Sequence, residues 1–203
     1  MPVGAVITAD IVNSTVLGTA MGKKLLAQLG IVLKNHIHEF YRGDSFQVYI
    51  KDPLAALKLA FRIRAVARRL SEQYDVRISI GIGKINTPVR SLRTANSEAF
   101  VLSGRMFDQS KDLGRLWIVS TDVKANIAFR VMSSFADYIL KRLTPRQAEV
   151  VAELLQEQTQ AQISKKIKKK QSTISKHAHS AGWPEIEKLL LEYHEVITQF
   201  NLK

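Results

Sequence analysis

Two aspartates occupy positions that could support metal-dependent chemistry. Asp10 ends an apolar, β-branched run that starts at Val3, and Asp44 lies in a short polar turn between two strand-like segments. If these strands belong to one sheet, the two carboxylates lie close together. Paired oxygen ligands suit Mg²⁺ or Mn²⁺ with a bound nucleotide, and such ions drive phosphoryl or nucleotidyl transfer. The spacing is equally compatible with a structural role, in which Asp10 caps the next helix and Asp44 is a turn residue.

A second group of residues, in the last third of the chain, has the pattern of a DNA-reading unit. Helical runs are predicted at 146–155, 159–167 and 171–180, and residues 164–180 contain six lysines and no acidic residue. The pattern predicts a helix-turn-helix whose last helix enters the major groove of double-stranded DNA while lysines neutralise phosphates. The turn lacks the usual glycine. The expected DNA contacts are Thr159, Gln160, Lys168, Lys169, Lys170, Gln171, Ser172, Thr173, Ser175, Lys176 and His179.

Composition narrows the function classes further. The net charge of +12 favours a polyanionic partner, although a lone charge run is often only a solvated face. The chain has no cysteine, which excludes disulfides, thiolate zinc sites and iron–sulfur clusters. No apolar run is long enough to span a bilayer and the N-terminus has no basic leader, so we expect no membrane partner and a cytoplasmic location.

The elements that would position these residues follow from hydrophobic periodicity. Strands are predicted at 3–12, 38–41, 45–50, 76–82 and 116–120, with helices at 15–35, 53–74, 96–110 and 122–141. In the helix at 53–74 the arginines Arg62, Arg64, Arg68 and Arg69 are expected to face outward. The resulting βαββαβ order predicts an α+β chain whose first part is a ferredoxin-like, cyclase-like palm.

The predicted domain boundary lies next to Thr144-Pro145, a favourable helix start. It divides the chain into a palm domain at 1–141 and an all-α helix-turn-helix domain at 142–203, which ends in a helix at 184–200. That last helix has more apolar residues than a three-helix core needs. It either packs on the first domain or forms a dimer seam, and we expect a homodimer because such proteins commonly read paired half-sites.

Three motifs resemble class III nucleotide cyclases: Ala9-Asp-Ile-Val-Asn-Ser-Thr15, Arg42-Gly-Asp-Ser-Phe46 and Val76-Arg-Ile-Ser-Ile-Gly-Ile82. The resemblance implies that Asp10 and Asp44 hold the metal and that Arg105 stabilises the transition state. Three features depart from the family pattern. Val101 stands where the family has an asparagine, and His38 where it has a base-recognising lysine. No acidic residue stands where the family has its second base-reading residue.

A resemblance to SatD-type proteins covers nearly the whole chain. It rests on Val6-Ile-Thr-Ala-Asp-Ile-Val-Asn-Ser14, Tyr41-Arg-Gly-Asp-Ser-Phe-Gln47, Ser97-Glu-Ala-Phe100 and Ser103-Gly-Arg105. It implies a cyclase-like palm fused to a DNA-binding tail, with no named reaction. The expected ligand contacts around the two aspartates are Asn13, Ser14, Arg42, Ser45, Gln47, Glu98, Ser103 and Arg105. A plain ion pair between Arg42 and Glu98 explains those two residues as well.

These features support three functions. The favoured one is a transcriptional regulator whose palm senses a nucleotide or another phosphate ligand. A second is a divergent cyclase or phosphotransferase with a DNA-binding tail. The third is a nonspecific nucleic-acid-binding scaffold, because without a turn glycine the affinity could be mainly electrostatic.

Overall fold

The apolar strands predicted from the sequence assemble into one open, mixed sheet. The computed structural model describes residues 1–14, 19–41, 43–110 and 114–203. Its strands are β1 (Val3–Ile11), β2 (Ile37–Tyr41), β3 (Ser45–Ile50), β4 (Val76–Lys84) and β5 (Leu116–Ser120), in the order β2-β3-β1-β4-β5. Only β5 pairs in parallel, with β4. The predicted α+β class is therefore confirmed.

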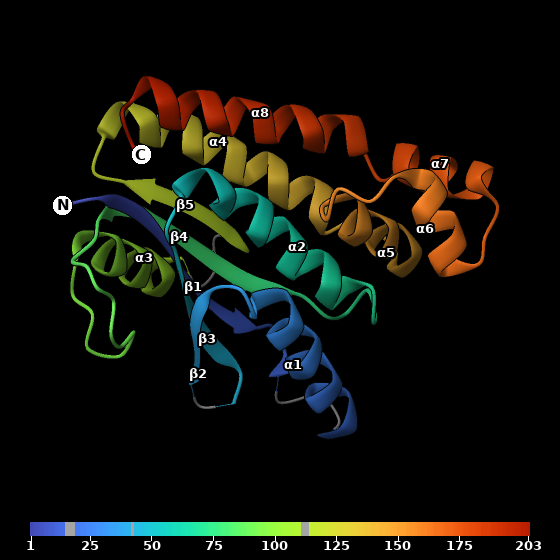
Figure 1. Cartoon of the computed structure of the whole chain (residues 1–203), viewed down its shortest axis with the longest axis horizontal. Coiled ribbons are helices and arrows are strands. Elements are labelled where there is room, and N and C mark those ends of the chain that lie inside the picture. The colour runs from blue at the N-terminus through green and yellow to red at the C-terminus, as the bar shows by residue number, and fades with distance from the viewer. Residues whose placement is uncertain (15–18, 42, 111–113) are drawn as a thin grey trace.

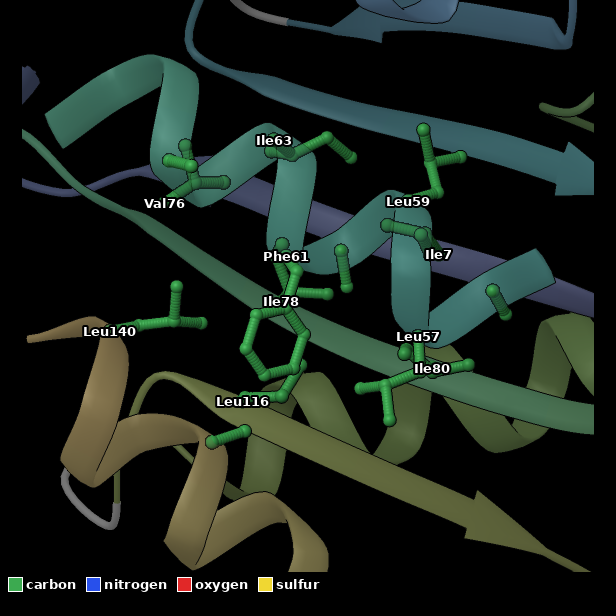
Figure 2. Packing of buried hydrophobic residues seen from close by; sticks show 14 of the residues in the cluster. Ile7, Leu57, Leu59, Phe61, Ile63, Val76, Ile78, Ile80, Leu116 and Leu140 are labelled. Atoms are coloured by element: carbon green, nitrogen blue, oxygen red, sulfur yellow. The ribbon is translucent and has the colours of Figure 1, made fainter. Parts of the chain in front are cut away.

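The two faces of the sheet are covered differently. Alternate residues of β1, among them Ala5 and Ile7, face a large core built with helices α1 (Thr19–Leu33) and α2 (Ala56–Arg68), the latter preceded by a 3₁₀ turn at Pro53–Ala55. Figure 2 shows α2 side chains stacked over Ile7, Ile78 and Ile80. The intervening residue Val6 joins a smaller cluster with α3 (Glu98–Gln109). A sheet covered by apolar elements on both faces explains the nearly continuous hydrophobic run of β1.

One glycine allows α3 to lie directly on the sheet. A Cβ atom at Gly81 would stand 2.3 Å from the carbonyl oxygen of Ala99 and 2.5 Å from the backbone nitrogen of Ser103. Backbone atoms cannot move aside as a flexible side chain can, so any larger residue would push α3 away from β4. This close approach puts the middle of α3 within reach of polar residues on β1.

The expectation that four arginines of α2 face outward is wrong for two of them. Arg64 is completely buried and Arg68 nearly so, whereas Arg62 and Arg69 are half-buried. The helix also ends at Arg68 and not near residue 74. The cause is that α2 is sandwiched, with the sheet on one side and the later helices on the other (Figure 1). A surface helix has one polar face, but a central helix can keep a charge only by pairing it.

The buried charges of α2 are paired with acids from two other elements. Arg64 donates to both carboxylate oxygens of Asp75 at 2.8 and 2.9 Å, and it also pairs with Asp137. Arg115 reaches Asp75 at 2.8 Å as well. Burial by itself would raise the pKa of Asp75, but the guanidinium groups of Arg64 and Arg115 outweigh it and lower the pKa below its usual value. The network ties α2 to β4, β5 and α4.

Five helices follow the sheet: α4 (Val123–Leu140), α5 (Pro145–Leu154), α6 (Gln160–Ile167), α7 (Gln171–Ser180) and α8 (Trp183–Gln199). Capping boxes at Thr144 with Gln147 and at Thr159 with Gln162 start α5 and α6, the first of them at the helix start that the sequence predicts. Figure 1 shows α6 and α7 at the end of the molecule opposite both termini. No helix within the described ranges has both the length and the apolar character needed to cross a bilayer.

The main core continues across residues 141 and 142, where the sequence predicts a domain boundary. Val151 and Leu155, which follow the predicted boundary, join the main core, whereas Val150, Ile163, Ile174 and Ala178 form a small buried cluster of their own. The apolar stripe of α8 also packs inward, where the Tyr193 hydroxyl donates to the Pro53 carbonyl at 2.9 Å. The interpretation of α8 as a dimer seam is therefore wrong, and the alternative of packing on the first part is correct.

Candidate functional site

The two aspartates lie close together at one end of the sheet. Asp10 pairs in register with Ser45, and the backbone nitrogen of Ile11 donates to the Asp44 carbonyl at 3.0 Å. Both carboxylates are already engaged by protein groups. Arg77 donates to the two oxygens of Asp10 at 3.2 and 2.8 Å, while Ser14 and Ser45 donate to Asp44 at 2.7 and 3.3 Å.

Arg77 supplies the positive charge that a metal ion would bring to Asp10. Its guanidinium is held on three sides: by Asp10, by the ring of Phe107 at 4.0 Å from the centroid, and by the Phe107 carbonyl at 3.4 Å. A cation would have to displace this arginine before it could use both oxygens of Asp10. Among the described residues no group of three or more histidine, cysteine or acidic side chains could hold a metal. The residues present thus fit an arginine–carboxylate pair better than a resident cation.

The other residues expected around the aspartates divide into two sets. Ser14, Ser45, Gln47 and Ser103 lie on the same polar face of the sheet as Asp10, or at its end. Asn13 is exposed there, in a left-handed conformation with a φ of 57°. Arg42 lies outside the described residues.

The structure does not bring Glu98 to this site. Its carboxylate accepts a hydrogen bond from the backbone nitrogen of Lys84 at 2.8 Å, at the end of β4 that pairs with Val3. Asp10 lies seven residues further along β1, a distance of about 23 Å for extended chain. Arg105 is exposed on α3, and within the described residues it makes no hydrogen bond or ion pair. The ligand role expected for Glu98 is therefore wrong.

A directed chain of hydrogen bonds crosses the polar face of the sheet. The Gln47 amide donates to the Thr8 hydroxyl at 3.2 Å, and the Thr8 and Ser103 hydroxyls are 3.0 Å apart. Ser103 in turn donates to the Phe100 carbonyl at 3.1 Å. Because every link has a donor and an acceptor, the chain fixes the direction of the Thr8 hydroxyl, which donates to Ser103.

Beside this chain lies a cavity of about 280 Å³. Tyr41 closes one side, with its hydroxyl 3.2 Å from Glu39 and 3.4 Å from the Gln47 oxygen. Burial, and next the adjacent Glu39 carboxylate, raise the pKa of Tyr41 to about 12, so the phenol stays a donor at neutral pH. Arg93 pairs with Glu39 at 2.6 Å. The cavity lining is Thr8, Ala9, Tyr41, Ser45, Phe46, Gln47, Arg93 and Phe107.

Sequence reasoning missed several residues of this face, namely Thr8, Glu39, Tyr41, Arg77 and Arg93. One signal was available: Thr8 and Asp10 are the polar residues of an otherwise apolar strand, and alternation places them on one face. Arg93 carries no such signal, because it comes from a loop between β4 and α3.

The second candidate surface is the exposed face of α7. The helix packs inward through Ile174 and Ala178, which are buried in the small helical cluster. Its opposite side exposes short polar or basic side chains: Gln171, Ser172, Ser175, Lys176 and His179. Thr173, another expected contact, is only half-exposed. No hydrogen bond or ion pair within the described chain engages the side chains of the five exposed residues.

The lysine turn before α7 has a defined conformation despite the missing glycine. Lys168 adopts the left-handed region, with a φ of 57° and a ψ of 46°. The backbone nitrogen of Lys169 donates to the Ser164 carbonyl at 3.1 Å, and the Ser164 hydroxyl donates to the Lys169 carbonyl at 2.6 Å. These two bonds offset part of the strain of the left-handed residue. The side chains of Lys168, Lys169 and Lys170 are all exposed.

Comparisons with known proteins add no relative: no protein-family model matches the chain, and no curated protein matches it significantly.

Proposed function

We propose that this chain is a DNA-binding regulator, in which α6 and α7 act as a helix-turn-helix and the polar face of the sheet holds a small ligand. The observation that carries the proposal is the exposed side of α7, which is polar, unpaired and flanked by lysines. A helix of this kind can contact base edges in the major groove while the flanking lysines contact phosphates.

The two ends of the molecule are joined by packing that could transmit a ligand signal. Val151 of α5 and Leu155, which caps that helix, belong to the core shared with α2. At the surface of the same contact, Arg62 donates to Gln156 at 2.8 Å and Lys58 pairs with Glu157 at 2.6 Å. A ligand that favours one placement of α2 would therefore bias α5 and the helices attached to it.

A ferredoxin-like palm is the interpretation of the sheet that we favour. The strand order β2-β3-β1-β4 with two crossover helices supports it. The ligand we expect there is small, polar and able to accept hydrogen bonds, such as a nucleotide or another phosphate compound. Arg93 offers it positive charge and N–H donors, whereas the Tyr41 and Thr8 hydroxyls already donate to Glu39 and Ser103 and mainly shape the cavity.

Catalysis by a cyclase-like mechanism is the weaker alternative. Arg77 engages Asp10, and Val101 and His38 stand where the resemblance expects an asparagine and a lysine. A transition state without preorganised charge gains little stabilisation. Incubation with the four nucleoside triphosphates and Mg²⁺ or Mn²⁺, followed by chromatography, tests this alternative; turnover that is lost in Asp44→Asn would establish an enzyme.

The test of DNA binding compares two variants that lose the same charge. Lys169→Ala with Lys176→Ala changes the proposed surface, whereas Lys23→Ala with Lys24→Ala removes two exposed lysines from α1. Fluorescence anisotropy with labelled duplex DNA is recorded over a series of salt concentrations. We expect the first variant to reduce the slope of log K against log salt by about 1.8, since each phosphate contact contributes about 0.9. The second variant should leave the slope unchanged.

Either of two results would reject the proposal. Wild-type protein that does not bind duplex DNA at low salt would do so directly. An equal loss of affinity in both lysine variants would show that net charge, and not α7, governs binding. Competition with random duplex DNA then separates a sequence-specific regulator from a nonspecific scaffold, because only the former binds one selected sequence about 10³-fold or more tightly.

A further inference from the structure

Helix α4 carries a row of large apolar side chains that the other described residues leave largely exposed. The exposed fractions are 76% for Val123, 56% for Ile127, 68% for Val131, 41% for Phe135 and 53% for Tyr138. The row runs along one side of the helix for about 22 Å. Single exposed apolar residues are ordinary, but five in one row need an explanation.

We propose that this row pairs with the same row of a second copy of the chain. Its four-residue spacing, from Val123 through Ile127 and Val131 to Phe135, forms one continuous ridge on the helix. Ridges of this type interdigitate with each other in the commonest mode of helix packing, in which the axes cross at about 50°. The surface can therefore be its own partner, as a two-fold interface requires.

The order of side-chain sizes in the ridge suits such a two-fold axis at Val131. An axis there brings Val131 against its own copy in an antiparallel pair of helices. It also places Ile127 of each chain opposite Phe135 of the other, so that a smaller side chain faces a larger one. Interfaces of this kind fill space without gaps between the helices.

The size of the surface also agrees with a dimer. The five exposed side chains amount to about 500 Å² of mainly apolar surface, at the upper end of what monomers expose. A stable interface buries about 800 Å² on each partner, and a polar rim normally surrounds its apolar centre. Lys124, Arg130 and Ser134 are exposed beside the ridge and supply part of that rim.

A membrane surface is a less suitable partner for α4. Interfacial helices need a strongly charged face opposite the apolar one. The opposite side of α4 is instead buried in the protein core through Phe129 and Ala136. The Tyr138 ring is also partly covered by Arg142, whose guanidinium lies 4.2 Å from the ring centroid.

The ridge leads toward the proposed DNA-binding end. A cavity of about 370 Å³ adjoins Phe135 and Tyr138 and is lined on its other side by His179 and Ser180 of α7. Pairing through α4 would thus hold two copies of α7 in a fixed relation, which suits paired half-sites on DNA. The pairing itself does not depend on DNA binding and is measured without DNA.

The test replaces one ridge residue by a charge and compares it with a matched change elsewhere. Val131→Glu puts two like charges at the proposed axis, whereas Leu191→Glu changes a residue of similar exposure, 64%, on α8. Sedimentation velocity should give a mass of about 46 kDa for the wild type, twice the 22.8 kDa of one chain, and for Leu191→Glu. Val131→Glu should sediment as a monomer while its thermal unfolding is unchanged.

The absence of natural cysteine allows a second, geometric measurement. Val131→Cys should form an intermolecular disulfide under mild oxidation, because a residue on a two-fold axis meets its own copy. Ile127→Cys should crosslink poorly alone but efficiently when mixed with Phe135→Cys. This pattern would distinguish the proposed axis from random collision.

Three outcomes would overturn the proposal. One is a wild-type protein that stays monomeric up to about 100 µM, well above the dissociation constant of ordinary specific dimers. Another is equal dissociation by Val131→Glu and Leu191→Glu. The third is a monomer that binds anionic lipid vesicles and loses this binding in Val131→Glu, which would assign the ridge to a membrane surface.

Discussion

The fully buried Arg64 provides the sharpest test of the internal packing. Replacement by methionine keeps a long side chain but removes the charge that faces Asp75 and Asp137, whose side-chain exposures are 0% and 17%. The matched control is Arg69→Met at the C-terminal cap of α2, where the side chain is half-exposed and donates to the Gln28 amide oxygen.

Removing one partner of a buried ion pair costs about 3–5 kcal/mol. We expect the lower end, about 3 kcal/mol, because both acids keep another partner. The side chain of Arg115 still reaches Asp75 at 2.8 Å, and its backbone nitrogen donates to Asp137 at 2.6 Å. The control removes a partly solvated charge and should cost about 0.5 kcal/mol or less.

Urea unfolding at pH 7 measures both changes. With a slope of about 2–3 kcal/mol per molar, a loss of 3 kcal/mol lowers the unfolding midpoint by about 1–1.5 M. The combined variant Arg64→Met with Asp75→Asn should lose about 1 kcal/mol less than the sum of the two single changes, because the second removes an acid that the first left short of a partner. An Arg64→Met protein as stable as Arg69→Met, or strictly additive losses, would refute the assignment of a buried, coupled network.

Three further predictions follow from single residues. Lys168→Gly should raise the free energy of unfolding by about 0.5–1 kcal/mol, because glycine adopts the left-handed region without strain; a lower stability in urea would contradict this prediction. The same change removes one charge, so the slope of log K against log salt for DNA binding should fall by about 0.9. Tyr193→Phe should cost about 1 kcal/mol, because it removes one buried hydrogen bond to the Pro53 carbonyl, which keeps its bond from the Ala56 backbone nitrogen; an unchanged melting temperature would show that the Tyr193 bond contributes nothing. Because folding lowers the pKa of Asp75, this carboxylate stabilises the folded state fully above pH 3.8, its ordinary pKa, and that stabilisation is lost as the pH falls through the lower pKa of the folded state. In Asp75→Asn, stability measured by circular dichroism should therefore depend less on pH below about pH 4 than in the wild type.

Local signals in the sequence located the strands and most helices, although the helix predicted to reach residue 74 ends at Arg68. Alternation and apolar runs located all five strands, because each is a period that the backbone geometry imposes on nearby residues. Thr144-Pro145 marked a helix start for an equally local reason: a cap bonds to backbone atoms three residues away.

Tertiary structure alone decided which helix faces are covered and which charges meet. The arginines of α2 look like a surface face in the sequence, and Arg64 is buried only because α4 and α5 cover that side. The apolar stripe of α8 resembles a dimer seam in isolation, yet it packs inward, and the uncovered row belongs to α4. Arg77 meets Asp10 only because β4 pairs with β1 in one register. The periodicity of the sequence predicts which side chains share one face of a helix or strand. The residues that cover that face come from segments distant in the sequence, and only the folded chain brings them together.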